Sequence, residues 1–319
     1  MAYADEVFKS MCRDIIDNGT DTTGELVRPV WTDTGEKAYT IKKFGVINRY
    51  DLRKEFPILT LRPTAMKSAL KELLWIWQKK SNDVNDLHPI KIWDAWADET
   101  GSIGKAYGYQ AAQKYNHHIF SNKDAEEIQN NPNITKEYPS LYINKHNLPN
   151  DNKYLALDQI DGVIWDLKHN PYSRRIITNL YNHQDLFEMH LYPCAYMMTF
   201  NVTKDKDSDK LVLNLMLNQR SQDVLAANNW NVVQYSLMLH MIAQVCGMIA
   251  GEFVHVISDC HIYDRHIPII KELISRESYP APTLKINTDI TNFYDFTADD
   301  FELENYQHGT QIKNIPIAV

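Results

Sequence analysis

A run of apolar residues at positions 232–250 is the feature that most constrains the fold of this chain. The run is about long enough to cross a bilayer as a helix. It nevertheless carries the polar side chains Gln234, His240 and Gln244. A helix that is apolar on most of its faces is more simply the central helix of a large soluble core. We therefore predict a long buried central helix and no membrane partner.

The composition fits a soluble globular protein and disfavours some partners. Of the 319 residues, 44% are hydrophobic and 23% are charged, which is ordinary for a chain that can bury a sizeable core. The net charge of -8 disfavours a broad electrostatic grip on nucleic acid or on anionic membranes. Nucleic acid is therefore not expected as a partner, although a few local arginines could still hold a small anion.

The cysteines and the first residues indicate a cellular compartment. Cys12, Cys194, Cys246 and Cys260 form no CxxC pair, and four cysteines are too sparse for a disulfide scaffold or a thiolate metal site. No metal is expected. The first residues lack the basic and apolar regions of a signal peptide. We therefore expect a reduced, cytoplasmic location.

Hydrophobic periodicity predicts a mixture of helices and strands. Helices are predicted at residues 5–18, 63–80, 155–169, 232–250 and about 263–276, and strands at 175–181, 195–202, 211–218 and 253–258, with strands and turns at 37–60. The strand at 211–218 places Leu211, Leu213, Leu215 and Leu217 on one face, which should be buried. Because strict βαβ alternation is missing, we predict an α+β fold with a large mixed β-sheet backed by helices.

Residues 114–154 differ in character from the rest of the chain. They are rich in Asn, Lys, His and Pro and show weak periodicity. We interpret them as a surface insertion, able to hold short helices, within a single domain that spans residues 1–319.

Cys194 is a candidate nucleophile. It lies in a Tyr-Pro-Cys-Ala segment at the start of a predicted strand, where Pro193 restrains the backbone. Most isolated cysteines are small buried hydrophobic residues. A nucleophilic thiolate would need cationic or hydrogen-bonding neighbours that lower its pKa.

Two cationic segments could hold an anion. The run Gln219-Arg220-Ser221-Gln222-Asp223 follows an apolar strand abruptly, and an arginine fork beside a serine hydroxyl suits an oxyanion or phosphate. Arg174-Arg175 forms a second pair. Taken singly, each is as well explained by a solvated turn or by the end of a helix.

Three further groups of side chains have both a structural and a functional interpretation. Glu72 lies on a predicted helix, off its apolar stripe, and is either exposed or a general acid/base facing a cleft. Trp93 and Trp96 are either core or a wall for a flat heterocycle. His261 and Tyr263 either cap a turn or donate to a sugar hydroxyl.

The order of these motifs along the chain is more informative than any one of them. The segments are KELLWIW (71–77), IWDAWADETGSIGKAYG (92–108), NPYSRRII (170–177), LYPCAY (191–196), NQRSQDV (218–224), Asn231 at the head of the long helix, ISDCHIYDRH (257–266) and PIAV (316–319). Together they resemble the thymidylate synthase family from about residue 60 to the last residue. No glycine-rich phosphate loop or dinucleotide fingerprint is present.

The resemblance implies a reaction. Members of this family convert dUMP to dTMP, with methylenetetrahydrofolate giving both the carbon and the hydride and leaving as dihydrofolate. Cys194 would add to uracil C6 and make C5 a nucleophile. Glu72 would organise proton transfers, and Tyr107 would lie near the C5 proton.

The resemblance also implies binding residues and a homodimer that shares its active sites. For dUMP these would be Arg28, Gln219, Arg220, Ser221, Asn231 on the pyrimidine edge, and His261 and Tyr263 on the deoxyribose, with Arg174 and Arg175 reaching over from the partner subunit. For the folate they would be Trp93, Trp96 and Asp223, with Val319 closing over the bound pair.

The sequence departs from the family pattern at three places. Ala195 follows the cysteine where His is usual, residues 227–230 read Ala-Asn-Asn-Trp in place of Gly-x-Pro-Phe, and the N-terminal phosphate loop lacks its usual Gly/Thr run. Cys194 and Asn231 are kept, so the departures bear on folate affinity and loop closure and not on the chemistry itself.

Two other functions fit part of the pattern. A dUMP or dCMP hydroxymethylase of the same superfamily would quench the intermediate with water instead of hydride, and Asn231 argues for uracil over cytosine. A catalytically dead nucleotide-binding or regulatory protein would not need a nucleophile, so the joint retention of Cys194, Glu72, Tyr107 and Asn231 argues against it.

Overall fold

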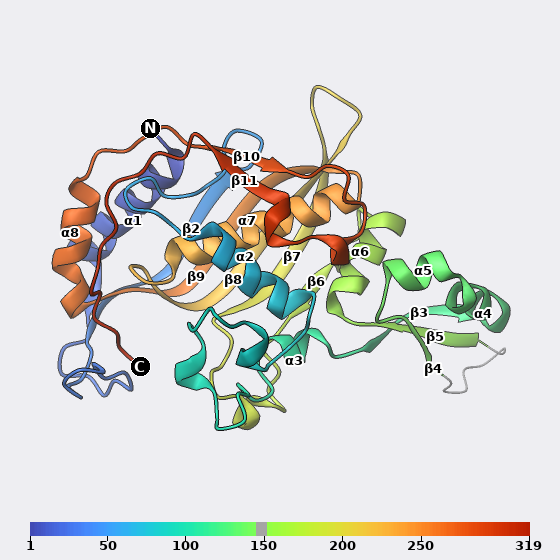
Figure 1. Ribbon diagram of the computed structural model, residues 1–319, viewed down its shortest axis with the longest axis horizontal. Helices are drawn as coiled ribbons and strands as arrows, with labels where there is room; N and C mark the ends of the chain where they lie inside the picture. The colour runs from blue at the N-terminus through green and yellow to red at the C-terminus, as the bar shows by residue number, and fades with distance from the viewer. Residues whose placement is uncertain (145–151) are drawn as a thin grey trace.

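A computed structural model of the chain describes residues 1–144 and 152–319 (Figure 1). Its centre is a six-stranded sheet. The strands, in spatial order, are β1 (Thr20–Asp21), β2 (Thr40–Asp51), β9 (Ile249–Tyr263), β8 (Leu211–Asp223), β7 (Ala195–Lys204) and β6 (Ile177–Asn179). Only the β8–β9 pair is parallel, so the sheet is mixed as predicted.

Helices cover one side of the sheet. α7 (Asn228–Val245) and α2 (Met66–Trp77) lie across it in Figure 1. The other helices of the main body are α1 (Tyr3–Asn18), α3 (Gly108–Ala111), α6 (Gln159–His169) and α8 (Ile267–Ser275), and a small hairpin is formed by β10 (Thr283–Ile286) and β11 (Phe301–Glu304). Leu213, Leu215 and Leu217 are buried and Leu211 is half-buried, which confirms the predicted apolar face.

The predicted central helix is real but begins and ends earlier than expected. Almost every side chain of α7 is buried, as a helix that is apolar on most faces should be. It ends at Val245 because Gly247 takes a φ of +68°, and Ile249 already belongs to β9. Within the described residues, no helix is long and apolar enough to cross a membrane.

Several predicted boundaries were wrong in ways that matter for the site. The polar run 219–223 does not follow a strand but is the end of β8, and His261 and Tyr263 likewise lie within β9. The end of β8 pairs in parallel with the end of β9, and this pairing provides hydrogen-bond partners for the backbone groups of both segments. Both segments therefore stay in the sheet although their side chains are polar. The helix predicted at 155–169 begins only at Gln159, and the one predicted from about 263 begins as α8 at Ile267 after a short 3-10 turn.

The described part of residues 114–154 contains more regular structure than predicted. The short helices are α4 (Asn122–Asn130) and α5 (Pro132–Glu137). Strands β3 (Tyr115–Ser121), β4 (Tyr142–Asn144) and β5 (Asn152–Leu157) form a separate antiparallel sheet in the order β3-β5-β4, which weak periodicity had hidden. In Figure 1 this sheet and its helices extend sideways from the main body next to α6.

Part of the six-stranded sheet is open in the single chain. A hollow of about 520 Å³ lies on it, lined mainly by polar side chains such as Asn201, Asn214 and Glu252. Strand β2, which lines the hollow with Arg49 and Asp51, also carries Phe44 and Ile47, which are 90% and 57% exposed. Such large apolar side chains at the surface of a sheet are typical of a protein interface.

Candidate active site

Cys194 lies directly before β7, held by an arginine from the neighbouring strand. The backbone N–H of Arg220 on β8 donates to the Cys194 carbonyl at 2.9 Å. Its guanidinium donates from Nε to the Pro193 carbonyl at 3.1 Å and from Nη2 to the Tyr192 carbonyl at 2.7 Å. The arginine therefore fixes the turn that carries the thiol and brings a positive charge to it.

The electrostatics of the thiol combine burial with positive charge. Burial raises the pKa of Cys194, and the charges of Arg220 and Arg28 oppose that rise. The net shift is upward, so the thiol of the free protein is protonated at neutral pH. A nucleophilic thiolate therefore requires a base or a change in surroundings when substrate enters.

Tyr107 reaches the same turn from a strained position. Its backbone has a φ of 41°, a region that costs a residue with a side chain about 1–3 kcal/mol. The next residue must be glycine, since a Cβ on Gly108 would lie 2.0 Å from the Ser81 carbonyl oxygen. The Tyr107 hydroxyl accepts a 2.9 Å hydrogen bond from the Cys194 backbone N–H, so the strained residue contacts the candidate nucleophile.

Glu72 is buried and accepts hydrogen bonds from three side chains. Trp93 Nε1 donates at 2.7 Å, Gln234 Nε2 donates at 2.6 Å, and Trp230 Nε1 donates to the same carboxylate. Burial raises the pKa of Glu72, and the three donors oppose that rise. This excludes the interpretation of Glu72 as an exposed helix residue.

A chain of amides connects the sheet to Glu72. Burial lowers the pKa of His255 to about 3, so its neutral ring donates from Nε2 to Gln219 Oε1 at 2.9 Å. Gln219 Nε2 then donates to Asn231 Oδ1 at 3.3 Å, and Asn231 Nδ2 donates to Gln234 Oε1 at 3.2 Å. Because Gln234 donates onward to Glu72, each of these three side-chain amides has one defined orientation.

The paired ends of β8 and β9 collect the remaining polar groups. Ser221 pairs with Asp259, and Asp223 pairs with His261. His261 Nδ1 lies 2.7 Å from Asp259 Oδ1, and the Tyr263 ring packs edge-on against His261 at 5.1 Å. The paired ends of these two central strands thus bring Ser221, His261 and Tyr263 to the same end of the sheet as Gln219 and Arg220.

Asp223 holds the turn between β8 and α7. Its Oδ1 accepts from the backbone N–H groups of Leu225 at 2.9 Å and Ala226 at 3.1 Å. Burial raises the pKa of Asp223, but His266 and the Ala226 N–H lower it by more, so the net shift is downward and the carboxylate is ionised. Much of its hydrogen-bonding capacity is therefore used within the chain.

The two tryptophans differ in exposure. Trp93 is buried, and its ring packs 4.9 Å from Tyr107 and 5.7 Å from Trp96. Trp96 is half-buried at the end of a 3-10 turn. Trp93 therefore serves mainly as a donor to Glu72, while Trp96 is the ring that remains accessible.

The C-terminal tail pairs with the segment that carries Arg28. Val319 and Val30 exchange two backbone hydrogen bonds of 2.9 and 3.1 Å, and the Thr32 N–H donates to Ile317. Arg28, two residues before Val30, is exposed and its charge lowers the pKa of the Cys194 thiol. The tail and the arginine segment therefore form one paired unit beside the site.

Arg174 and Arg175 are the predicted residues that the structure does not bring to Cys194. They follow α6, are exposed, and have no side-chain hydrogen bond or ion pair within residues 1–144 and 152–319. Neither charge is among the groups that shift the pKa of the Cys194 thiol. Within one chain this cationic pair is unused.

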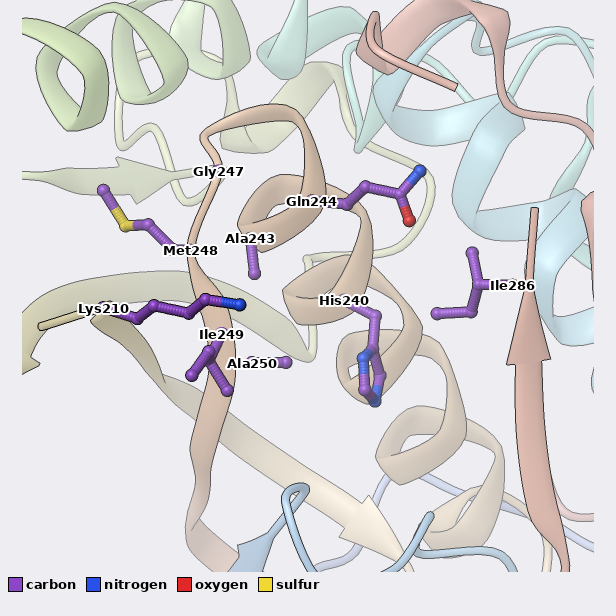
Figure 2. A pocket seen from close by; sticks show the side chains of 9 residues that line it. All are labelled: Lys210, His240, Ala243, Gln244, Gly247, Met248, Ile249, Ala250 and Ile286. Carbon is purple, nitrogen blue, oxygen red and sulfur yellow. The ribbon is translucent and has the colours of Figure 1, made fainter. Parts of the chain in front are cut away.

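A separate hollow lies at the far end of α7 (Figure 2). It measures about 400 Å³ and is lined among others by His240, Gln244, Met248 and Lys210. None of the predicted site residues lines it, and burial lowers the pKa of His240 to about 4, so that side chain is neutral. We therefore take the Cys194 end of the sheet, and not this hollow, as the candidate site.

Three residues of the hydrogen-bond network were missed by sequence reasoning: Trp230, Gln234 and His255. Gln234 had a recognisable signal, because it lies one helical turn after Asn231 in an otherwise apolar helix. Trp230 was noted only as a departure from the family pattern. His255 gave no signal, since a single histidine in a strand is ordinary.

Comparison with known proteins identifies the family. The sequence model described as thymidylate synthase matches residues 6–319. This chain belongs to the thymidylate synthase family. Two relatives named thymidylate synthase are those of Bacillus subtilis subsp. natto, 40% identical, and of Bacillus phage phi3T, 39% identical, each over 314 residues and 98% of both chains.

A solved structure agrees with the thymidylate synthase assignment. The thermostable thymidylate synthase A of Bacillus subtilis superimposes with a TM-score of 0.81 at 39% identity, covering 99% of each chain. The α+β fold, the methyltransferase activity and the methylenetetrahydrofolate co-substrate implied by the motifs are thereby confirmed. Nothing in these comparisons favours a hydroxymethylase.

Proposed function

We propose that the residues around Cys194 carry out the thymidylate synthase reaction on dUMP. The observation that supports this most is that two groups of functional side chains lie at the same end of the sheet. One is a cysteine backed by Arg220 and Tyr107, and the other is the amide chain that joins Asn231 to Glu72. A nucleophile, a pyrimidine reader and an acid/base are the three functions that the reaction requires.

The phosphate of dUMP is bound by arginine donors that the fold leaves free. Arg220 has five N–H donors, and two are used on the Pro193 and Tyr192 carbonyls. The remaining donors, the Ser221 hydroxyl and the exposed Arg28 bind phosphate oxygens. His261 and Tyr263 bond the deoxyribose hydroxyl farther along the same edge.

Asn231 reads the uracil edge. Its Oδ1 keeps a lone pair beyond the bond from Gln219, and its Nδ2 keeps one hydrogen beyond the bond to Gln234. Oδ1 accepts from uracil N3–H while Nδ2 donates to uracil O4. Gln219 and Gln234 set this orientation before the substrate arrives, so no reorganisation is needed.

Cys194 opens the reaction. Its sulfur forms a bond to C6, its proton leaves to solvent or a nearby base, and the electron pair of the C5–C6 double bond moves to C5 and O4. Donors from Asn231 stabilise the charge on O4. Methylenetetrahydrofolate supplies the one-carbon unit and the hydride when it is bound.

Glu72 and Tyr107 handle the protons. Tyr107 lies beside the cysteine, where its oxygen can take part in removing the C5 proton once C5 carries the new carbon. Its own pKa is raised by burial, so Tyr107 remains a neutral relay and Glu72 is the acid/base behind it. Loss of the sulfur from C6 restores the ring double bond and frees Cys194.

The enzyme acts as a homodimer with shared sites, as one cytoplasmic domain that carries the 114–154 insertion. Two features support the dimer: the apolar Phe44 and Ile47 at the open part of the sheet, and the unused cations Arg174 and Arg175. A twofold axis would apply the same surface of both copies to one another.

The deciding experiment supplies dUMP tritiated at C5 together with methylenetetrahydrofolate. The expected result is tritium in water alongside equal dTMP and dihydrofolate, and the Cys194→Ala variant should release none while still binding dUMP. Tritium release without dihydrofolate would indicate a hydroxymethylase. Substantial dTMP from the alanine variant would disprove the role of Cys194.

A further inference from the structure

Two histidines and an aspartate meet where the insertion lies against α6. His117 and His118 are on β3, and Asp166 is on α6. Asp166 Oδ1 lies 3.1 Å from His117 Nε2 and 3.3 Å from His118 Nε2. One ligand atom from each of the three residues lies within 4.8 Å of the other two. None of them belongs to the active site described above.

A bulge in β3 explains how adjacent histidines reach the same helix. Neighbouring side chains of a regular strand point to opposite faces. Here Asn116 pairs with Ala156 and His118 with Leu155, so His117 is an extra residue without a partner of its own on β5. The two imidazole rings pack edge-on at 4.4 Å instead of diverging. The bulge therefore creates the cluster.

The ring nitrogens in this cluster are not satisfied by hydrogen bonds. Nε2 of His117 and Nε2 of His118 are both buried and both lack a hydrogen-bond partner. Their distances to Asp166 are those of an ion pair, but their angles are not those of a hydrogen bond. Buried polar atoms normally have a bonding partner. Two unpaired ring nitrogens beside one carboxylate therefore indicate a cation that all three groups can bind.

A divalent transition metal fits this geometry, and we propose that His117, His118 and Asp166 bind Zn²⁺. Zinc binds imidazole nitrogen and carboxylate oxygen at about 2.0–2.2 Å, which places tetrahedral ligand atoms roughly 3.3 Å apart. The two nitrogen-to-oxygen separations of 3.1 and 3.3 Å match that spacing. Two imidazoles also select Zn²⁺ over Mg²⁺ or Ca²⁺, which prefer oxygen ligands alone.

The fourth ligand is water. The side chain of His118 is 35% exposed, against 10% for His117 and 16% for Asp166, so the metal enters and keeps its water on the His118 side. Trp165 closes another side, with its ring 5.8 Å from that of His118. Gly162, one turn before Asp166, leaves room for Tyr115 and His117 against α6, because a Cβ there would lie 2.2 Å from Tyr115 Oη and 3.2 Å from His117 Cε1.

The position of the cluster gives the metal a structural task. It would join β3 of the insertion to α6 of the main body, and five residues after α6 ends the chain reaches Arg174 and Arg175. A zinc ion there fixes the base of the insertion and, with it, the helix that leads to this arginine pair. The site lies apart from Cys194, so its metal takes no part in the chemistry.

The test uses the full chain carrying Cys194→Ala, so that the thiol does not compete for metal. Zinc titrated by calorimetry should bind at one ion per chain, and Co²⁺ should show the absorption of a site with nitrogen and oxygen ligands. His117→Gln, His118→Gln and Asp166→Asn should each weaken binding by about 100-fold or more, since even outer-shell partners are worth 10–100-fold. His308→Gln, at an exposed histidine elsewhere, should change nothing.

His118→Gln guards against loss of binding through unfolding, because His118 is the most exposed of the three and its removal keeps the contact between His117 and Asp166. Its circular dichroism and metal-free melting temperature should match those of the parent. Zinc should raise the melting temperature of the parent and not of this variant. Equal zinc affinity in the two proteins, or no stoichiometric binding by the parent at micromolar zinc, would overturn the proposal.

Discussion

The hydrogen bond from Trp230 to Glu72 can be removed by restoring the residue that the family usually has. Trp230→Phe keeps an aromatic ring and deletes one of the three donors to a buried carboxylate. A hydrogen bond to a charged group is worth about 1.5–3 kcal/mol. At 1.36 kcal/mol per pH unit, the titration of Glu72 should move up by about one to two pH units.

Stability should respond to pH in a defined direction. Burial already raises the pKa of Glu72 in the folded chain, so this residue contributes stability that is fully present below the unfolded pKa and is lost as pH rises through the folded pKa. Without the Trp230 donor the pKa of Glu72 in the folded chain is higher still, so the stability lost as the pH rises is larger. The variant should therefore be less stable than wild type by about 1.5–3 kcal/mol more at pH 8 than at pH 4.

Urea unfolding from pH 4 to 8 and the pH profile of kcat/KM measure the two effects. The acidic limb of the rate profile should shift upward by the same one to two pH units if ionised Glu72 is needed. Trp75→Phe is the matched control, because Trp75 is also buried but donates to the Asp83 backbone carbonyl at 3.0 Å. Its destabilisation should not vary with pH. A pH-independent difference in Trp230→Phe as well would refute the reasoning.

Three further predictions follow from the site. Asn231→Asp should lose dUMP turnover and gain dCMP binding, because a carboxylate accepts from the cytosine amino group and repels uracil O4. The measurement is kcat/KM for both nucleotides, and an unchanged preference for dUMP would contradict the prediction. Deleting Val319 should lower kcat far more than dUMP affinity, since its two bonds to Val30 support closure, and a wild-type rate would rule that out. Mixing inactive Cys194→Ala with inactive Arg174→Ala should restore part of the activity after subunit exchange, whereas no recovery would argue against shared sites.

The fold class and the central helix could be predicted from the sequence because they depend on hydrophobic periodicity. Leu213, Leu215 and Leu217 alternate along β8 and are buried, as the pattern requires. The strand ends could not be predicted. Gln219 through Asp223 are polar, and only their pairing with β9 keeps them in the strand, which is a long-range effect absent from local sequence.

The candidate residues could be named from motifs, but their connections could not. The sequence shows Glu72 and Trp230 far apart, and only the packing of α2 on α7 brings an indole N–H to the carboxylate. The histidine pair on β3 escaped notice for a similar reason. Reasoning about metals began from cysteines, whereas His117 and His118 share a face only because of a bulge that sequence patterns do not reveal.

The pairing of Val319 with Val30 has a practical consequence for handling the protein. The last residue exchanges two backbone hydrogen bonds with Val30, so a purification tag, a dye or a surface tether fused to it would have to leave directly from this pairing, close to Arg28. The N-terminal residue is better suited to such attachments, because Met1 is 73% exposed. Ala2 is already buried, and its N–H donates to the Tyr279 carbonyl. Biosensors and immobilised forms of this enzyme should therefore be anchored by the first residue.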